Sequence, residues 1–242
     1  MFIFICSNYI NLRCVHHSRL DSAPFIEQMK ILSEIMRFVQ FTSIKHNIDE
    51  SHALGHSMKV LHHAHQIYEN SVYTYPILKS QRPVIYSAAL LHDMCDKKYM
   101  NQTLGIQQIN EFLTDKLDYC EIKFTKEIMN SMSYSTVKKY GFPALGKYQM
   151  AYHIVREADL LAAYDFDRSL IYHMYQTNGE FIESYDNALQ LFEDRIFKHH
   201  ADQLFITDYS KHKAHQLHRD AILQIQTWKR VVELYQSREK ME

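Results

Sequence analysis

The chain has 242 residues, enough to bury a substantial core in one large domain or two small ones. With 27 Lys and Arg against 28 Asp and Glu, its formal charge is −1, so it has no broad attraction for a nucleic-acid polymer or an anionic membrane surface. Its four cysteines include no Cys-x-x-Cys pair, which argues against a zinc ribbon or a disulfide scaffold and favours a reducing, intracellular compartment, the cytoplasm.

The N-terminal stretch MFIFIC is apolar for six residues and has no basic segment before it, so it is too short to span a bilayer and unlike a secretory signal. We expect residues 1–20 to form a loosely attached leader and residues 21–237 to form a single domain. Only five Gly and four Pro interrupt the chain, and no two strand-like runs are joined by a hairpin turn. The expected fold class is therefore all-α, with about seven to nine helices.

The first helices are predicted from apolar residues that recur every three or four positions. One helix opens at Pro24, and the next has Asp49 or Ser51 as its candidate N-cap. A third is expected to begin at Pro83, because proline suits a first helical turn. Its sequence PVIYSAALLHDM is apolar nearly all round, as in a buried central helix. Further amphipathic segments follow near residues 103–117, 121–132, 148–163, 180–199 and 209–236.

A His–Asp pair, His92 and Asp93, lies at the end of the predicted buried helix. Adjacent side chains on a helix differ by about 100°, so the pair could hold one ion from two sides. A divalent metal bound by nitrogen and oxygen needs several such ligands from different elements. His56 lies in the preceding helix, and Asp159 lies in a following helix among apolar residues, where an unpaired carboxylate would be costly to bury.

Each of these residues also has a simpler interpretation. A lone His56 is more often a hydrogen-bonded helix histidine, and Asp159 could pair with Arg156, three residues earlier on the same face. The histidine clusters at 62–65 and 199–200 could bind metal, although solvated helix faces explain them more simply. The order and context of the set as a whole nevertheless favour a metal site.

The order His56…His92–Asp93…Asp159 resembles the HD superfamily of metal-dependent phosphohydrolases. DESHALGHSMKV resembles that family's SHxxxH-xx-[RK]V opening, AALLHDMCDKKY its apolar helix ending in HD, and VREADLLAA its late ADxL helix. NSMSYS, residues 130–135, is similar to a segment of one bacterial-type subgroup. The resemblance covers roughly residues 49–170, with the helices of 180–236 beyond it, and implies a helical bundle of the HD-domain type in which these four residues bind the metal.

The resemblance implies one divalent metal ion, with Mn, Fe, Co, Ni, Zn and Mg all left open. Two-metal members, including oxygenases, carry two further histidines between the HD pair and the last Asp. This chain has only His153 in that interval, and it should point about 120° away from Asp159 around a helix. Four nitrogen and oxygen ligands leave up to two positions on a six-coordinate ion for water and a phosphate oxygen.

The reaction implied is hydrolysis of a phosphate ester by a metal-activated water, with a nucleotide or another small phosphorylated molecule as substrate. We expect Asp96, one helical turn after His92, to shuttle a proton and Lys97 to bind phosphate. A solvated helix terminus is the alternative interpretation of these two residues. Alarmone hydrolases resemble this family but carry Glu–Asp at these positions, which argues against that particular reaction.

Three further residues are candidates for binding phosphate. His52, one turn before His56, either donates to a phosphate or orients His56. Arg156 is the second candidate. Arg168 is the third, with a surface ion pair as the simpler interpretation.

A second hypothesis is a non-catalytic, metal-stabilised binding or regulatory module of the HD type. An open pocket beside the metal would favour the enzyme, and a closed cage would favour the module. The chain contains no P-loop, GxGxxG or HExxH sequence, so ATP-dependent, NAD-dependent and zincin chemistry have no support.

Overall fold

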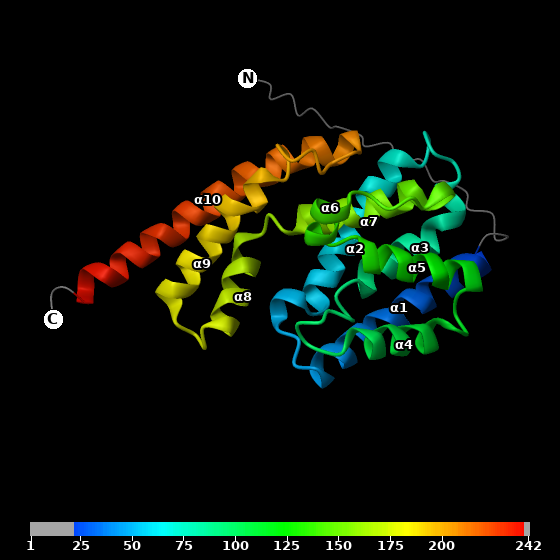
Figure 1. Cartoon of the computed structure of the whole chain (residues 1–242), viewed down its shortest axis with the longest axis horizontal. Coiled ribbons are helices and arrows are strands. Elements are labelled where there is room, and N and C mark those ends of the chain that lie inside the picture. Colours follow the sequence, from blue (N-terminus) through cyan, green and yellow to red (C-terminus); the bar gives the residue numbers. More distant parts are fainter. Residues whose placement is uncertain (1–21, 240–242) are drawn as a thin grey trace, which may run out of the picture.

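The computed structural model describes residues 22–239, which form ten α-helices and three short 3₁₀ helices with no strand among them. The predicted all-α fold class is confirmed. The expected leader, residues 1–20, lies outside the described part of the chain. In Figure 1, α1, α3, α4 and α5 gather on one side, α8, α9 and α10 on the other, and α2, α6 and α7 lie between them.

The bounds of the elements fix where the site residues fall. The first half of the chain contains α1 (Ser22–Lys45), η1 (Glu50–His52), α2 (Leu54–Ser71), α3 (Leu78–Leu91), α4 (Gln102–Leu113) and α5 (Tyr119–Ser131). The second half contains α6 (Tyr134–Tyr140), η2 (Gly146–Tyr148), α7 (Gln149–Ala162), α8 (Phe166–Gln176), α9 (Phe181–Asp194), η3 (Ile196–Lys198) and α10 (Asp208–Glu239).

Helices α2, α3 and α7 form the centre of the core, where each packs against the other two. Most of the apolar run in α3 is buried, as its sequence predicts: Val84, Ile85 and Leu90 have no exposed surface. Ile154 and Ala158 of α7 are equally buried. Because these three helices touch one another, side chains near their ends can converge on one point.

Two helices begin at places other than those predicted. Pro83 lies inside α3, which already begins at Leu78. It leaves only the carbonyl of Lys79 without its usual helical donor, and Lys79 is exposed, so water can replace that hydrogen bond. Asp49 caps the 3₁₀ turn η1, whereas α2 begins only at Leu54 and has no side-chain cap.

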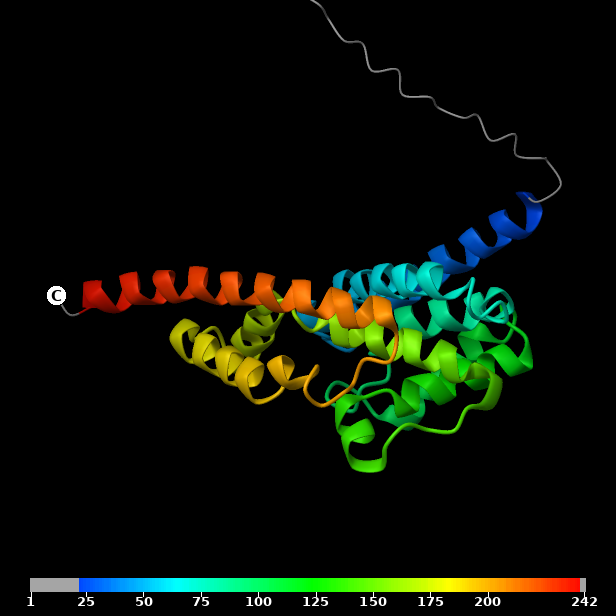
Figure 2. The same ribbon diagram turned by 90° about the horizontal axis from the view of Figure 1, so that it is seen from above.

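Two short helices, α6 and α8, were not among the predicted segments. Both begin at capping residues: the side chain of Ser133 accepts the backbone N–H of Thr136, and that of Asp165 accepts the N–H of Arg168. Helix α10 is the longest helix, with 32 residues, and Figure 2 shows it running past α9 to the C-terminal end. None of the described helices is long and apolar enough to cross a membrane.

The histidine clusters are only partly solvated. His62, His65 and His200 are exposed, as expected, but His63 and His199 are buried. The interpretation as solvated helix faces is therefore wrong for these last two. They lie on the core-facing sides of their segments, where a histidine must stay neutral unless it is paired.

Candidate metal centre and adjacent cavity

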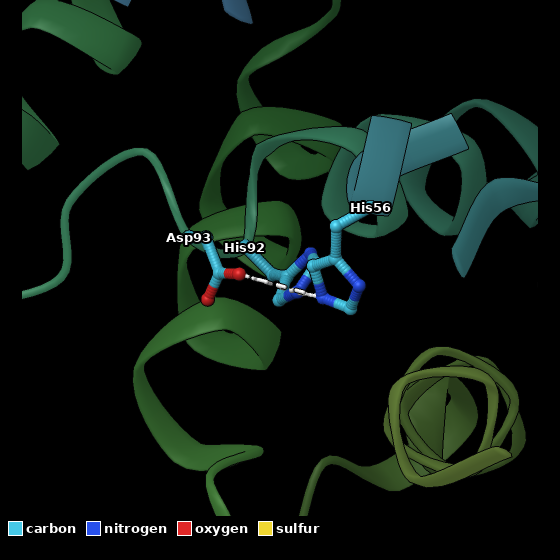
Figure 3. Close-up of side chains that lie close together, drawn as sticks. All are labelled: His56, His92 and Asp93. Carbon is cyan, nitrogen blue, oxygen red and sulfur yellow. Dashed lines mark hydrogen bonds and ion pairs between the residues drawn. The ribbon is translucent and has the colours of Figure 1, made fainter. Parts of the chain in front are cut away.

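Three ligand-type side chains meet where α2 and α3 touch. His56 lies in the first turn of α2, while His92 and Asp93 directly follow the last residue of α3. The Nε2 atoms of the two imidazoles are 3.1 Å apart, and Oδ2 of Asp93 lies 3.4 Å from that of His56 and 3.3 Å from that of His92. Figure 3 shows the three side chains pointing toward one another, and one ligand atom of each lies within 4.8 Å of the other two. They form a possible metal site.

Asp159 reaches the same place from α7. Its Oδ1 lies 3.4 Å from Nε2 of His56 and 3.6 Å from Nε2 of His92. Its side chain is 29% exposed, so the carboxylate is not sealed inside the apolar helix packing around it. All four residues of the predicted ligand set therefore lie together, because α2, the end of α3 and α7 meet at this point.

The hydrogen bonds around the histidines suit metal binding. Nδ1 of His92 lies 2.9 Å from the carbonyl oxygen of Ala89 and donates its hydrogen there, so whenever the ring is neutral its lone pair is on Nε2, the nitrogen close to His56 and Asp93. Oδ2 of Asp93 is buried and has no hydrogen-bond partner among the described residues. A buried oxygen without a donor is costly, and a cation would satisfy it. The two-nitrogen, two-oxygen donor set thus fits a divalent transition metal better than Mg²⁺, which prefers oxygen ligands.

The charges of the cluster support the same interpretation. Burial, together with the nearby Arg168 guanidinium, lowers the pKa of His56 to about 4. Burial also acts to lower the pKa of His92, but the carboxylates of Asp93 and Asp159 outweigh it and raise that pKa well above its ordinary value. In turn the imidazoles hold the pKa of both carboxyl groups low in spite of their burial. Without metal, the site stabilises a positive charge on His92 between two carboxylates, the place where a cation would sit.

His92, Asp93 and Asp159 of the cluster line a cavity of about 640 Å³. Its walls combine the carboxylates of the centre with basic side chains, so it suits an anionic molecule that approaches a cation. The charged residues that line it are Asp93, Asp96, Lys97, Lys98, Asp159, Arg168 and Arg195.

Asp96 and Lys97 both line this cavity, but they lie in turns after α3 rather than in a helix. Oδ1 of Asp96 accepts the backbone N–H of Lys98 at 2.9 Å, and its Oδ2 lies 3.6 Å from Nζ of the same lysine. Lys97 is exposed at the cavity. The predicted helical turn between His92 and Asp96 is thus absent. Asp96 and Lys97 nevertheless line the same cavity as His92 and Asp93.

Of the two arginines that the sequence suggested as phosphate-binding residues, Arg168 lines the cavity and Arg156 does not. Arg156 is buried, and its guanidinium donates to the carbonyl of Leu204 and stacks 4.7 Å from the ring centroid of Phe142. It does not line the cavity, and its carboxylate neighbour is Glu157 rather than Asp159. Arg168, by contrast, lines the cavity and donates from Nε to the carbonyl of Ser51, with no ion pair among the described residues.

Two parts of the cavity were not predicted as such. Arg195, the C-cap of α9, lies outside the range of the resemblance, and its guanidinium stacks 4.3 Å from the ring centroid of Tyr134. Ser133 and Ser135, on either side of that tyrosine, also line the cavity. The NSMSYS resemblance was the one sequence signal for this wall. His52 also lines the cavity and lies within a hydrogen-bond network formed with Asp49, Ser51 and Tyr99.

Comparison with known proteins supports the fold but assigns the chain to no family. No protein-family model matches the chain, and no curated protein matches it. A crystal structure of a structural-genomics target from Lactobacillus plantarum matches with a TM-score of 0.61 and 18% sequence identity, over 85% of this chain and 98% of that one. At this identity the likeness concerns the fold alone: the chain shares the helical architecture of that protein.

Proposed function

We propose that the chain is a metal-dependent phosphohydrolase that hydrolyses a phosphate ester of a small molecule such as a nucleotide. The observation that carries the proposal is that His92, Asp93 and Asp159 of the candidate centre line an open cavity whose other walls carry Lys and Arg side chains. A metal-stabilised module without turnover would more often enclose its ion in a closed cage. The resemblance of the four residues and their segments to the HD superfamily supports the same reaction.

The four clustered residues would hold one divalent ion, which when bound supplies a Lewis acid for the phosphoryl group and an activated water. Lys97 and Arg168, which both line the cavity, bind the non-reacting phosphate oxygens. Asp96 remains a candidate for moving a proton, although both of its oxygens already contact Lys98. Arg156 has no part in this proposal, because its guanidinium is bound to Leu204 away from the cavity.

Metal content tests the centre. Wild-type protein purified without chelator and supplemented with divalent metal should contain about one ion per chain, and Asp93→Ala should contain far less, since it removes a ligand. The gain in melting temperature on adding metal should shrink in the same variant. Asp186→Ala, which removes an exposed carboxylate from α9, is the matched control and should behave as wild type. A content near two, near zero, or unchanged in Asp93→Ala would refute the site.

Turnover tests the reaction. Metal-loaded wild type is assayed against a panel of phosphate mono- and diesters that includes nucleotides, with phosphate release or alcohol release as the readout. We expect hydrolysis of at least one class, abolished by Asp93→Ala and retained by Asp186→Ala. Protein that holds its metal and hydrolyses none of the panel would favour the binding module.

A further inference from the structure

A buried hydrogen-bond network surrounds Nδ1 of His52 at the edge of the cavity. Oδ1 of Asp49 accepts the backbone N–H of Ser51 at 3.0 Å and also the Ser51 hydroxyl. Oδ2 of Asp49 accepts the hydroxyl of Tyr99. The same two hydroxyl oxygens lie 2.7 Å and 3.1 Å from Nδ1 of His52. One imidazole nitrogen thus faces two hydroxyl groups that both already contact a carboxylate.

Counting hydrogens assigns the tautomer of His52. Burial acts to raise the pKa of Asp49, but hydrogen bonds with His52, Ser51 and Tyr99 lower it below its ordinary value, so the carboxylate is ionised and can only accept. Each hydroxyl has a single hydrogen and gives it to Asp49. Neither hydroxyl can then donate to His52, so Nδ1 must carry a hydrogen and donate it to them. The neutral ring therefore has its free lone pair on Nε2.

His52 belongs to the cavity of the candidate metal centre. Its ring centroid is 6.1 Å from that of His56 and 5.3 Å from that of Tyr172. Among the described residues no hydrogen bond reaches Nε2. A proton acceptor must reach the attacking water directly or through one further water, and the open cavity that His52 shares with His92, Asp93 and Asp159 provides that space. In this tautomer Nε2 of His52 accepts and does not donate to a phosphate oxygen, which was one of the two roles that the sequence suggested beside orienting His56.

We propose that His52 is the proton acceptor of the hydrolysis, an inference that rests on the proposed function. As the oxygen of the attacking water forms its bond to phosphorus, a water proton passes to Nε2 of His52. The bond between phosphorus and the leaving oxygen breaks, and its electron pair departs with that oxygen, which then takes up a proton from His52 or from solvent. Asp49, Ser51 and Tyr99 are positioning residues that hold the ring in the accepting tautomer.

The tautomer can be measured without any activity. Two-dimensional NMR of ¹⁵N-labelled full-length protein, chelator-treated and zinc-loaded, should show His52 with a protonated Nδ1 and an unprotonated Nε2, its signals assigned by their absence in His52→Gln. In Asp49→Asn the amide can donate to a hydroxyl, whose hydrogen then turns to Nδ1, so the tautomer should switch. A role in folding alone would not produce that switch. Observing Nε2–H in the wild type would overturn the proposal.

Kinetics test the proton transfer itself. On a substrate that the wild type hydrolyses, His52→Gln should lower kcat by a factor of about 10² or more with full metal content and little change in KM. Added imidazole should restore part of the kcat of His52→Ala but none in a metal-ligand variant. His65→Ala, an exposed histidine of α2, is the control. Wild-type kcat in metal-loaded His52→Gln would overturn the inference alone, whereas an inactive wild type would overturn the proposed function as well.

Discussion

Asp96 and Lys97 are neighbours in the chain, but the structure gives them different tasks. The carboxylate of Asp96 is held by Lys98, while Lys97 extends into the cavity without an ion pair among the described residues. A cation that contacts a non-reacting phosphate oxygen binds the substrate and the transition state about equally. Its loss should therefore appear in KM rather than in kcat.

We accordingly expect Lys97→Ala to raise KM with little change in kcat, measured by steady-state kinetics on a hydrolysed ester with metal content checked. Lys79→Ala, at an exposed position near the start of α3, is the control. Asp96→Asn in the same assay decides whether Asp96 also moves a proton: a fall in kcat as large as that of His52→Gln would give it an equal part. A fall in kcat for Lys97→Ala at unchanged KM would contradict the role of the lysine as an anchor.

The sequence was sufficient to predict which residues cluster but not which residues surround them. His56, His92, Asp93 and Asp159 were identified because their chemistry and order are specific. The contact between Tyr99 and Asp49 spans 50 positions and joins two turns outside the long helices, so no periodic pattern reports it. Side-chain networks of this kind depend on the path of irregular backbone, which composition and spacing do not determine.

At the level of elements, α7 connects the candidate site to the start of α10. Glu157, two positions before Asp159, has no exposed surface and accepts hydrogen bonds from the backbone N–H groups of Ile206 and Thr207 and from the Thr207 hydroxyl. Arg156 beside it donates to Leu204 in the same segment. These bonds hold the loop before α10 against α7, the helix that carries Asp159.

Glu157→Ala should lower the free energy of unfolding by about 3–5 kcal/mol, because it leaves the buried backbone N–H and hydroxyl of Thr207 without their acceptor and the buried Arg156 charge without its carboxylate. Urea denaturation at neutral pH measures this loss. Glu193→Ala removes an exposed carboxylate from α9 and should stay within about 0.5 kcal/mol of wild type. A loss in Glu157→Ala no larger than in this control would show that the bonds do not hold the loop.

The helices that the sequence predicted most accurately are those with long, regular apolar periodicity. The segments near 148–163 and 209–236 correspond closely to α7 and α10, because long amphipathic runs leave little choice. Helix α6 has only seven residues, and its start depends on the Ser133 cap alone. Proline fits a first helical turn, so the sequence predicts a start at Pro83, but the buried Leu78 packs against the core and α3 begins there, five residues earlier.

At the scale of the whole molecule, buried neutral histidines should make the fold sensitive to acid. Burial lowers the pKa of His63 and His153 to about 4, with nearby cationic groups adding to the effect. The unfolded chain then binds more protons than the folded one between about pH 4 and the ordinary value of 6.5. The stability that these residues contribute is complete above pH 6.5 and is lost as the pH falls. The contribution of His92 to stability changes with pH in the opposite direction, because its pKa is raised in the folded protein.

His199 is the residue at which the effect of a buried neutral histidine on acid stability can best be measured separately. It has no exposed surface, neither ring nitrogen has a hydrogen-bond partner among the described residues, and the rings of Tyr134, Tyr164 and Phe205 surround it. Burial lowers its pKa to about 3, and the Arg195 and Arg156 charges act in the same direction against the weaker opposing effect of Asp159. Phenylalanine has a similar shape and no proton to bind, so it should fit the same aromatic surroundings.

We measure the free energy of unfolding in urea at pH 7 and at pH 5. On going from pH 7 to pH 5 it should fall by about 2 kcal/mol less in His199→Phe than in wild type. Because the variant is compared with wild type at each pH, the contributions of His63, His153 and His92 cancel. His65→Phe, at an exposed position, should show the wild-type dependence. An equal fall in His199→Phe and wild type would mean that the imidazole is hydrated or paired in the folded protein, and that its protonation does not oppose folding.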